Sequence, residues 1–280
     1  PEVVRAGDTA AVDDVCTLLS LAQAGQLVQQ KGALEAHGVE LLAEQSLVRD
    51  PERAQFLYHL ARAANLLQVQ GRMVRIARER VRTWLAQPRT LQLRVLQEAW
   101  RGDLDWNDLW HVPGIRCEET GWRNDPLLAR AAVLELLGRC ESGAWLSVTG
   151  FVDTVREQAS DYLRPNGDFD SWYIRDVRSG DYLLGFEHWD RIEGALLAYL
   201  LSGPLHWLGM VSLGYQEGWE KPSAFQLTVW GAALLDSGAE LLPEPAAQPA
   251  RVAPNATITI PRTASLTDRF QLTRITEWRG

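Results

Sequence analysis

The chain has 280 residues, of which 46% are hydrophobic and 23% are charged. This composition is typical of a globular protein and excludes an intrinsically disordered chain, and the length favours two domains. The formal net charge of −8 excludes a protein that coats nucleic acid along its whole length, but a local basic patch is compatible with it.

The first part of the chain contains several stretches in which apolar residues recur at helical spacing. Helices are predicted over residues 12–22, 33–45, 51–67, 77–84 and 88–100. Residues 26–30 can form a short strand, and strand-like runs on both sides of Gln70-Gly71-Arg72 predict a β-hairpin over 66–77. Helix, short strand, two helices and hairpin is the order of a winged helix-turn-helix module, in which the hairpin is the wing.

The second half is expected to have a similar architecture without a repeated sequence. Helices are predicted over residues 127–140, 147–160, 189–201 and 228–237. Residues 210–213 and 224–228 resemble two strands around a glycine-rich turn region, which is a second hairpin candidate. We therefore expect two winged-helix-like units.

The stretch from Ala195 to Gln216 carries no Lys, Arg, Asp or Glu. A membrane-spanning helix needs about 20 predominantly apolar residues in succession. Ser202-Gly203-Pro204 interrupts this stretch, because proline lacks an amide donor and disfavours helix at the residue before it. The sequence therefore predicts a helix, a tight turn and a strand in a protein core, and no membrane partner.

Prolines dominate residues 243–250, which are predicted to be a linker. Beyond it, the segment 255–261 alternates like a strand, and 269–278 is predicted to be a strand or a strand that enters a helix. The predicted fold class is mainly α, of the α+β type, with two winged-helix-like modules joined by a helical connector and a small C-terminal β-containing segment. The predicted domains are a winged-helix-like module over 1–90, a helical connector over 91–125, a second winged-helix-like module over 126–242, the linker over 243–250 and the start of a small α/β domain over 251–280.

No pattern for enzymatic chemistry is present. The sequence has no GxxxxGK[ST] phosphate loop, no HExxH, no paired-cysteine zinc pattern and no GxSxG, and its five histidines are scattered. The segment 166–170, NGDFD, is predicted to be a polar turn rather than a cation loop. Three cysteines lie far apart and the N-terminus has no apolar signal core. We expect a cytoplasmic protein that is not an enzyme and holds no metal or cofactor.

Arginines are concentrated between Arg62 and Arg101, a segment that contains nine arginines and only two acidic residues, both glutamates. Because guanidinium groups suit bidentate contacts with phosphate oxygens, this segment is the candidate nucleic-acid interface. The residues predicted to contact nucleic acid are Lys31, Arg72, Arg75, Arg78 and Arg82. A solvated helix face, or pairing with the acidic segment 188–250 or with a partner, is the alternative.

The predicted reading helix of the first module, residues 33–45, carries Glu35, Glu40 and Glu44 and no Lys or Arg. Carboxylates are repelled by phosphates, so this helix is not expected to read bases. The sequence also holds 12 tryptophans, most of which are expected in the core. Trp172 and Tyr173 are the best candidates for stacking on unpaired bases.

Three groups of segments resemble a known family. They are "LSLAQAGQLVQQKGAL" with "RVRTWLAQP" and "LQEAW", "WDRIEGALLAYLLSGPLHWLGMVSLG" with "FQLTVWGAALL", and "RVAPNATITIPR" with "LTRITEW". Their order and spacing are similar to those of bacterial helicase-associated proteins that resemble the N-terminal domain of XPB-type DNA helicases. The resemblance implies winged-helix modules, a small α/β domain related to a damage-recognition element, and a role linked to DNA. Members of that family are usually longer, so the chain is expected to end just inside the last domain.

Two functions remain open from the sequence. The first is a non-enzymatic DNA-binding accessory protein that contacts the backbone with little sequence specificity, beside a separate motor or nuclease in repair, transcription or genome defence. The second is a protein–protein interaction scaffold, without DNA binding of its own, whose acidic surfaces bind a basic partner.

Overall fold

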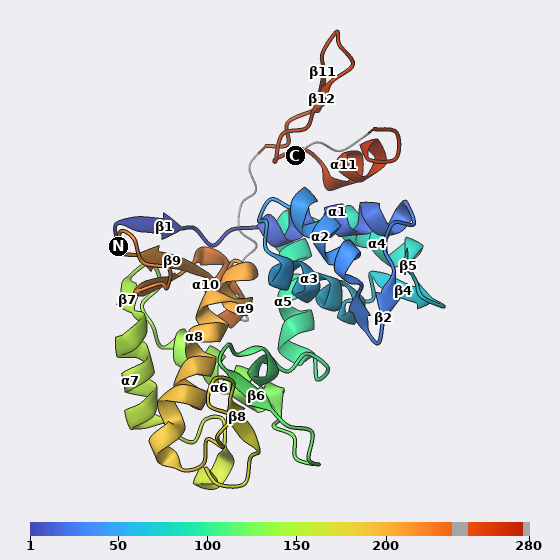
Figure 1. The fold of residues 1–280 in the computed structure, drawn as a ribbon. Helices are drawn as coiled ribbons and strands as arrows, with labels where there is room; N and C mark the ends of the chain where they lie inside the picture. The colour runs from blue at the N-terminus through green and yellow to red at the C-terminus, as the bar shows by residue number, and fades with distance from the viewer. Residues whose placement is uncertain (237–245, 277–280) are drawn as a thin grey trace. The chain divides into compact units, whose positions relative to one another are not determined.

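The computed structural model describes residues 1–236 and 246–276 and shows a mixed α+β protein in which helices outweigh strands (Figure 1). The chain divides into two compact units. The arginine unit combines Thr9–Trp100 with Glu240–Gly280, and the sheet unit combines Pro1–Asp8 with Arg101–Ala239. The predicted boundaries at 90/91 and 125/126 fall inside these units. Residues 243–245 of the predicted linker lie outside the described residues.

The arginine unit is a cluster of helices with short paired strands. In chain order its elements are α1 (Ala10–Gln23), β2 (Gln29–Gln30), β3 (Ala33–Leu34), α2 (Ala36–Gln45), α3 (Pro51–Ala63), β4 (Leu67–Gln70), β5 (Met73–Ile76), α4 (Arg78–Leu85), α5 (Arg89–Gly102), β11 (Arg251–Val252), β12 (Ile258–Thr259) and α11 (Leu266–Leu272).

Helix α3 begins where the sequence predicts it, but it ends at Ala63, and Leu67, which the predicted helix included, begins β4. Pro51 occupies its first turn, and the Asp50 carboxylate caps it by accepting hydrogen bonds from the amides of Glu52 and Arg53. Phe56 and Leu60 are fully buried. These contacts confirm the predicted amphipathic helix, whose stability comes from its buried face.

The predicted hairpin over 66–77 is confirmed. Strands β4 and β5 pair antiparallel from Leu67 opposite Ile76 to Gln70 opposite Met73. Gly71 has a φ of 64°, which glycine adopts at little cost. A third segment joins the free edge of β5, because the Gln29 amide donates to the Arg72 carbonyl at 2.8 Å and the Val74 amide donates to the Leu27 carbonyl at 3.1 Å.

The predicted helix over 33–45 begins later than expected. Ala33 and Leu34 form β3, which pairs antiparallel with β2, and α2 starts at Ala36. Lys31 and Gly32 make the turn between these strands, with φ values of 50° and 88°. This left-handed turn folds the chain back on itself, so a helix cannot form until the turn has been completed.

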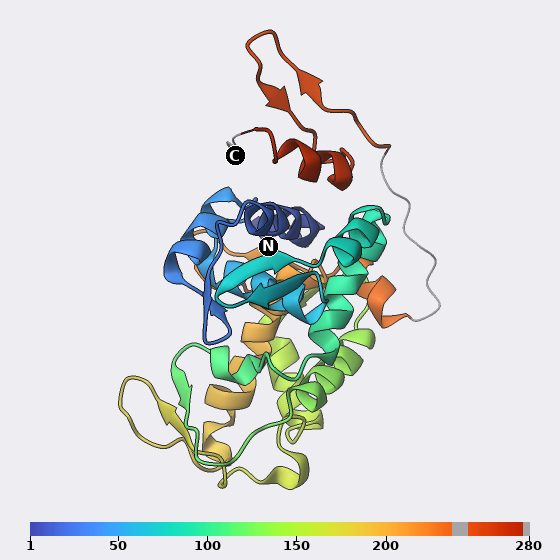
Figure 2. The ribbon, with the colours of Figure 1, turned by 90° about the vertical axis from the view of Figure 1, so that its right-hand side faces the viewer.

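Helix α11 lies alongside α1 in both ribbon views (Figures 1 and 2). The prediction of a strand at 269 onward is therefore wrong for the start of that segment. The Ser265 hydroxyl caps the helix by accepting from the Asp268 amide, and Leu266 and Phe270 are buried on one face. A spacing of four residues is about one helical turn, so these two apolar side chains lie on the same side of α11.

Buried ion pairs hold the arginine unit together. Asp13 on α1 is 1% exposed and accepts hydrogen bonds from Arg89, Arg262 and Arg269 at 2.7–3.0 Å. The neighbouring Asp14 pairs with Arg53 of α3. Because Arg262 and Arg269 belong to the C-terminal segment, Asp13 fastens that segment to α1.

The sheet unit contains a four-stranded antiparallel sheet in the order β1-β9-β10-β7. In chain order its elements are β1 (Val3–Arg5), β6 (Ile115–Cys117), α6 (Pro126–Gly138), β7 (Trp145–Ser147), α7 (Val148–Gln158), β8 (Ile174–Asp176), α8 (Ala195–Ser202), α9 (Pro204–Trp207), β9 (Val211–Tyr215), β10 (Ala224–Leu227) and α10 (Val229–Leu235). The second predicted hairpin is confirmed as β9 and β10, which pair from Val211 opposite Leu227 to Gly214 opposite Ala224.

The uncharged stretch 195–216 forms a core element, as predicted. Helix α8 ends at Ser202, Pro204 starts the short helix α9, and every residue of β9 is buried. Gly203 sits between the helices at φ −105° and ψ −108°. Among the described residues, no helix has both the length and the apolar character needed to cross a membrane.

An ion pair is buried in the sheet unit beside α8. Glu193 lies in a π-helical turn, Asp190–Gly194, that leads directly into α8. The Arg164 Nε lies 2.6 Å from the Glu193 Oε1, and both side chains are at least 98% buried. Burial raises the pKa of Glu193 to about 7, although the nearby Arg164 guanidinium opposes the shift.

This carboxyl is expected to make stability pH-dependent. Between pH 4.5 and about 7, the folded protein keeps a proton on Glu193 that the unfolded chain releases. The free energy of unfolding therefore falls as the pH rises through this interval, by about 3 kcal/mol. Glu193→Gln removes the titration. Urea titrations near pH 4.5 and near pH 7 measure the free energy of unfolding of wild type and variant. The wild type should lose about 3 kcal/mol relative to the variant between these two pH values. The same wild-type-minus-variant difference at both pH values would contradict the raised pKa of Glu193.

Candidate nucleic-acid interface

All five residues predicted to contact nucleic acid lie in the arginine unit, in two turns, one strand and one helix. Lys31 is exposed in the turn between β2 and β3, and Arg72 in the turn between β4 and β5. Arg75 is half-buried on β5, whereas Arg78 and Arg82 are exposed on α4. The hairpin leads into α4 within two residues. Arg72, Arg75, Arg78 and Arg82 therefore follow one another along one continuous segment, formed by the hairpin and α4.

Two of the predicted cations already pair with carboxylates. Arg72 bonds Glu35, and the Arg82 Nη1 lies 3.2 Å from the Glu79 Oε2. The Arg82 and Glu79 side chains are both more than three-quarters exposed. Exposed pairs of this kind contribute about 0–1 kcal/mol and are screened by salt, so a phosphate can replace the carboxylate.

Arg80 lies near the predicted cations, because it lines a hollow together with Arg75 and Arg78, although the helical spacing in the sequence did not single it out. It is exposed on α4 between Arg78 and Arg82. Within residues 1–236 and 246–276, no carboxylate pairs with Arg75, Arg78 or Arg80. We define Arg75, Arg78, Arg80 and Arg82 as the arginine ridge.

Other arginines of the 62–101 segment have structural roles. Arg89 bonds the buried Asp13. Arg62 donates to the Gly32 carbonyl at 3.0 Å and lies over the Tyr58 ring. The local excess of positive charge in the sequence therefore overstates the charge that is available to a ligand.

Helices α2 and α3, which directly precede the hairpin, are not suited to reading bases. Helix α2 exposes Glu40 and Glu44. Helix α3 buries seven of its thirteen residues, and the β2–β3 turn covers it further through the contacts of Leu34 with Gln55 and of Gly32 with Arg62. Base readout needs an exposed polar helix face that enters the groove, which these helices do not provide.

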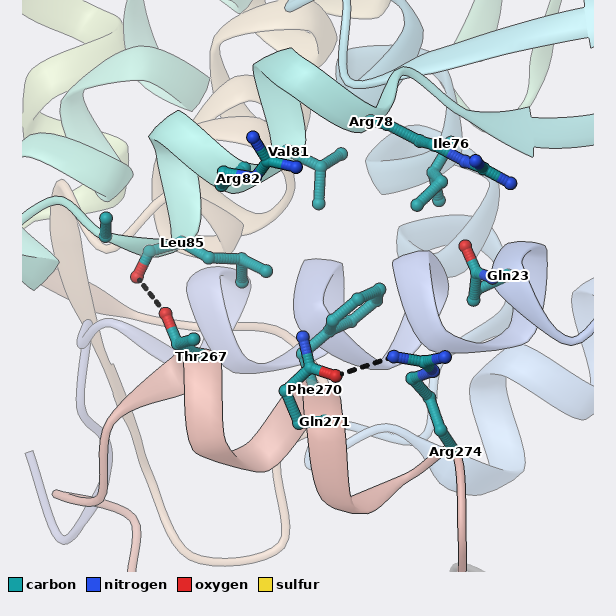
Figure 3. Close-up of a pocket in the computed structure, with 11 residues that line it drawn as sticks. Gln23, Ile76, Arg78, Val81, Arg82, Leu85, Thr267, Phe270, Gln271 and Arg274 are labelled. Atoms are coloured by element: carbon teal, nitrogen blue, oxygen red, sulfur yellow. Dashed lines mark hydrogen bonds between the residues drawn. The ribbon is translucent and has the colours of Figure 1, made fainter.

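A groove lies beside the arginine ridge, between α4 and α11 (Figure 3). Its volume is about 400 Å³. The apolar side chains that line it are those of Ile76, Val81, Leu85, Ala86 and Phe270. The polar ones are those of Gln23, Arg78, Arg82, Thr267, Gln271 and Arg274.

The aromatic candidates differ in exposure. Trp172 is half-buried, with its ring centroid 5.0 Å from that of Trp122 and 4.9 Å from the Arg164 guanidinium carbon. Its neighbours therefore occupy the surfaces on which a base would stack. Tyr173 is 46% exposed and meets Tyr182 edge-on, with 5.9 Å between ring centroids.

The described residues contain no cluster of three or more His, Cys, Asp or Glu side chains that could hold a metal ion. In the NGDFD segment, the Asp168 carboxylate accepts hydrogen bonds from the amides of Asp170 and Ser171, as in a polar turn. All three cysteines are thiols, and burial raises the pKa of Cys16 and of Cys117 to about 12. These two thiols are therefore poor nucleophiles at neutral pH.

No protein-family model matches the chain, and neither the curated proteins nor the solved structures contain a significant match.

Proposed function

We propose that the protein is a non-enzymatic DNA-binding accessory protein that grips the phosphate backbone with little sequence selectivity. The arginine ridge supports this proposal most strongly, because it offers four guanidinium groups on a hairpin and the helix that follows it, and three of them have no paired carboxylate among the described residues. Contacts of this kind fix a protein on DNA but carry no sequence information.

We also propose that both units are winged-helix modules. In the arginine unit, α1, the segment 27–29, α2, α3, β4 and β5 follow one another, and the segment 27–29 joins the outer edge of β5. In the sheet unit, α6, β7, α7, α8, β9 and β10 have the same order, and β7 pairs with β10. In such a module α3, and not the helix over 33–45, is the second helix of the helix-turn-helix pair.

The wider role is proposed from the resemblance in the sequence. A DNA-binding module without motor chemistry of its own is suited to act together with a separate motor or nuclease in repair, transcription or genome defence. The three thiols are compatible with a reducing compartment such as the cytoplasm.

The binding of wild-type protein to DNA tests this function. Fluorescence anisotropy with a labelled random-sequence duplex should give an association constant whose logarithm falls linearly with the logarithm of salt concentration. Four phosphate contacts predict a slope of about −3.6. The slope and affinity should be nearly the same for unrelated sequences. Absence of binding to duplex and single-stranded DNA at low salt would overturn the proposal.

A second candidate function is docking to a basic partner protein. The exposed Glu40 and Glu44 of α2 favour it, because winged-helix units with acidic helices cannot approach DNA by that side. A partner that binds there would be released by Glu40→Lys with Glu44→Lys, whereas the affinity for DNA would not decrease.

A further inference from the structure

The groove between α4 and α11 combines an apolar wall with a cationic rim. Figure 3 shows Val81, Leu85 and Phe270 directed toward the space between the two helices. Arg82 reaches it from α4 and Arg274 from the residues that follow α11. A concave site with a largely apolar lining and a few placed polar groups is the usual form of a binding site.

The charged side chains that line this groove are cationic. Of the residues that the structure describes, Arg78, Arg82 and Arg274 line it and no Asp or Glu does. Arg274 bonds the neutral Gln271 at 2.8 Å, and Arg82 bonds the exposed Glu79 outside the lining. The charged groups therefore require an anionic ligand, while the apolar wall requires that part of the ligand be hydrophobic.

Duplex DNA does not meet both requirements. Its phosphates can bond the guanidinium groups, but the apolar group that a paired duplex exposes is the thymine methyl, which is too small to fill a groove of about 400 Å³. An acidic peptide with a hydrophobic side chain can satisfy both, since its carboxylates pair with the arginines while the anchor enters the groove.

We propose that this groove binds an acidic segment of a partner protein, with one aromatic or large aliphatic side chain as its anchor. The site differs from the arginine ridge in three arginines. Arg274 lines the groove without belonging to the ridge, and Arg75 and Arg80 belong to the ridge without lining the groove. This difference makes the peptide site separable from the proposed DNA contact, and it does not depend on that contact.

The experiment measures the binding of a fluorescein-labelled peptide, Asp-Glu-Glu-Phe-Glu-Asp, to the full chain by anisotropy at low salt. Arg274→Ala is expected to weaken binding at least about fivefold through loss of one charge-assisted hydrogen bond. Arg80→Ala is the matched control on the same surface and should change the affinity less than about twofold. Replacing the peptide's Phe by Ala, which leaves the protein untouched, should also weaken binding at least about fivefold.

Three results would overturn the proposal. They are no binding of the acidic peptide, equal binding of its Phe and Ala forms, and equal affinity of wild type and Arg274→Ala. Duplex DNA measured on the same variants separates this site from the proposed function. Arg80→Ala should weaken DNA binding while Arg274→Ala does not, and an equal loss of DNA affinity in both would assign the groove to DNA instead.

Discussion

Replacing Arg75, Arg78, Arg80 and Arg82 together by alanine is expected to weaken duplex DNA binding roughly 100-fold at about 50 mM salt. Each guanidinium that binds a phosphate releases a counterion, so the slope of log affinity against log salt should become shallower by about 0.9 for each phosphate that is no longer neutralised. Arg72 is left in place because its partner Glu35 is only 36% exposed, whereas Glu79, the partner of Arg82, is 81% exposed and is more easily displaced by a phosphate. Anisotropy with a labelled duplex at several salt concentrations measures both quantities.

The control for this variant removes the same amount of charge elsewhere. Arg49, Arg123, Arg139 and Arg178 are exposed and lie outside the ridge. Their fourfold alanine variant has the same net charge as the ridge variant, so any effect of overall charge on association is matched. The proposal predicts a nearly unchanged salt slope for the control. Equal losses of affinity in the two variants would show that net charge, and not the ridge, governs binding.

Local patterns in the sequence predicted the elements that depend on neighbours along the chain. The hairpin β4–β5 follows from Gly71 between two strand-like runs, and α3 follows from an apolar stripe that begins after a proline. The end of α8 at Ser202 follows from Pro204. In each case the residues that decide the structure lie within a few positions of one another, so periodicity and turn chemistry suffice.

Contacts between distant residues could not be predicted in this way. Nothing local indicates that Arg89 pairs with Asp13, 76 positions away, or that Arg269 reaches the same carboxylate across 256 positions. The sequence therefore assigns Arg89 to a basic segment, whereas the fold buries most of its charge. The pairing of Glu193 with Arg164 is hidden for the same reason, since Glu193 lies beside an apolar helical stripe.

The candidate site likewise has one part that follows from local sequence patterns and another that depends on contacts between distant residues. Arg75 on β5 and Arg78 and Arg82 on α4 were predicted because the hairpin and the helix are local structures, whereas Arg80 was not singled out. The groove could not be predicted, because its second wall comes from α11, which lies nearly two hundred residues further along the chain, where a strand or a strand that enters a helix was expected from residue 269. Ser265, which caps α11, followed three positions later by Asp268 is the pattern that could have indicated a helix start there.

Asp13→Asn is expected to destabilise the arginine unit by roughly 3–5 kcal/mol, the usual cost of removing one partner from a buried ion pair. The variant keeps the side-chain shape, but it leaves three guanidinium groups around an uncharged amide. Arg269 is 7% exposed and Arg89 is 15% exposed, so water can restore little of the missing solvation. Urea titration measures the destabilisation, with Glu79→Gln as a control in an exposed pair, where a change within about 0.5 kcal/mol is expected.

The position of Asp13 gives this variant a second consequence. The carboxylate bonds Arg262 and Arg269 in the C-terminal segment and Arg89 at the start of α5, so its neutralisation should release α11 before the rest of the unit unfolds. Amide hydrogen exchange in α11 is therefore expected to accelerate more than exchange in α3, whose capping and apolar packing do not involve Asp13. If α11 separates, the groove loses one wall, and the affinity for the acidic peptide should fall while the arginine ridge still binds DNA. Unchanged protection of α11 would show that apolar packing of Leu266 and Phe270 holds the segment without the ion pairs.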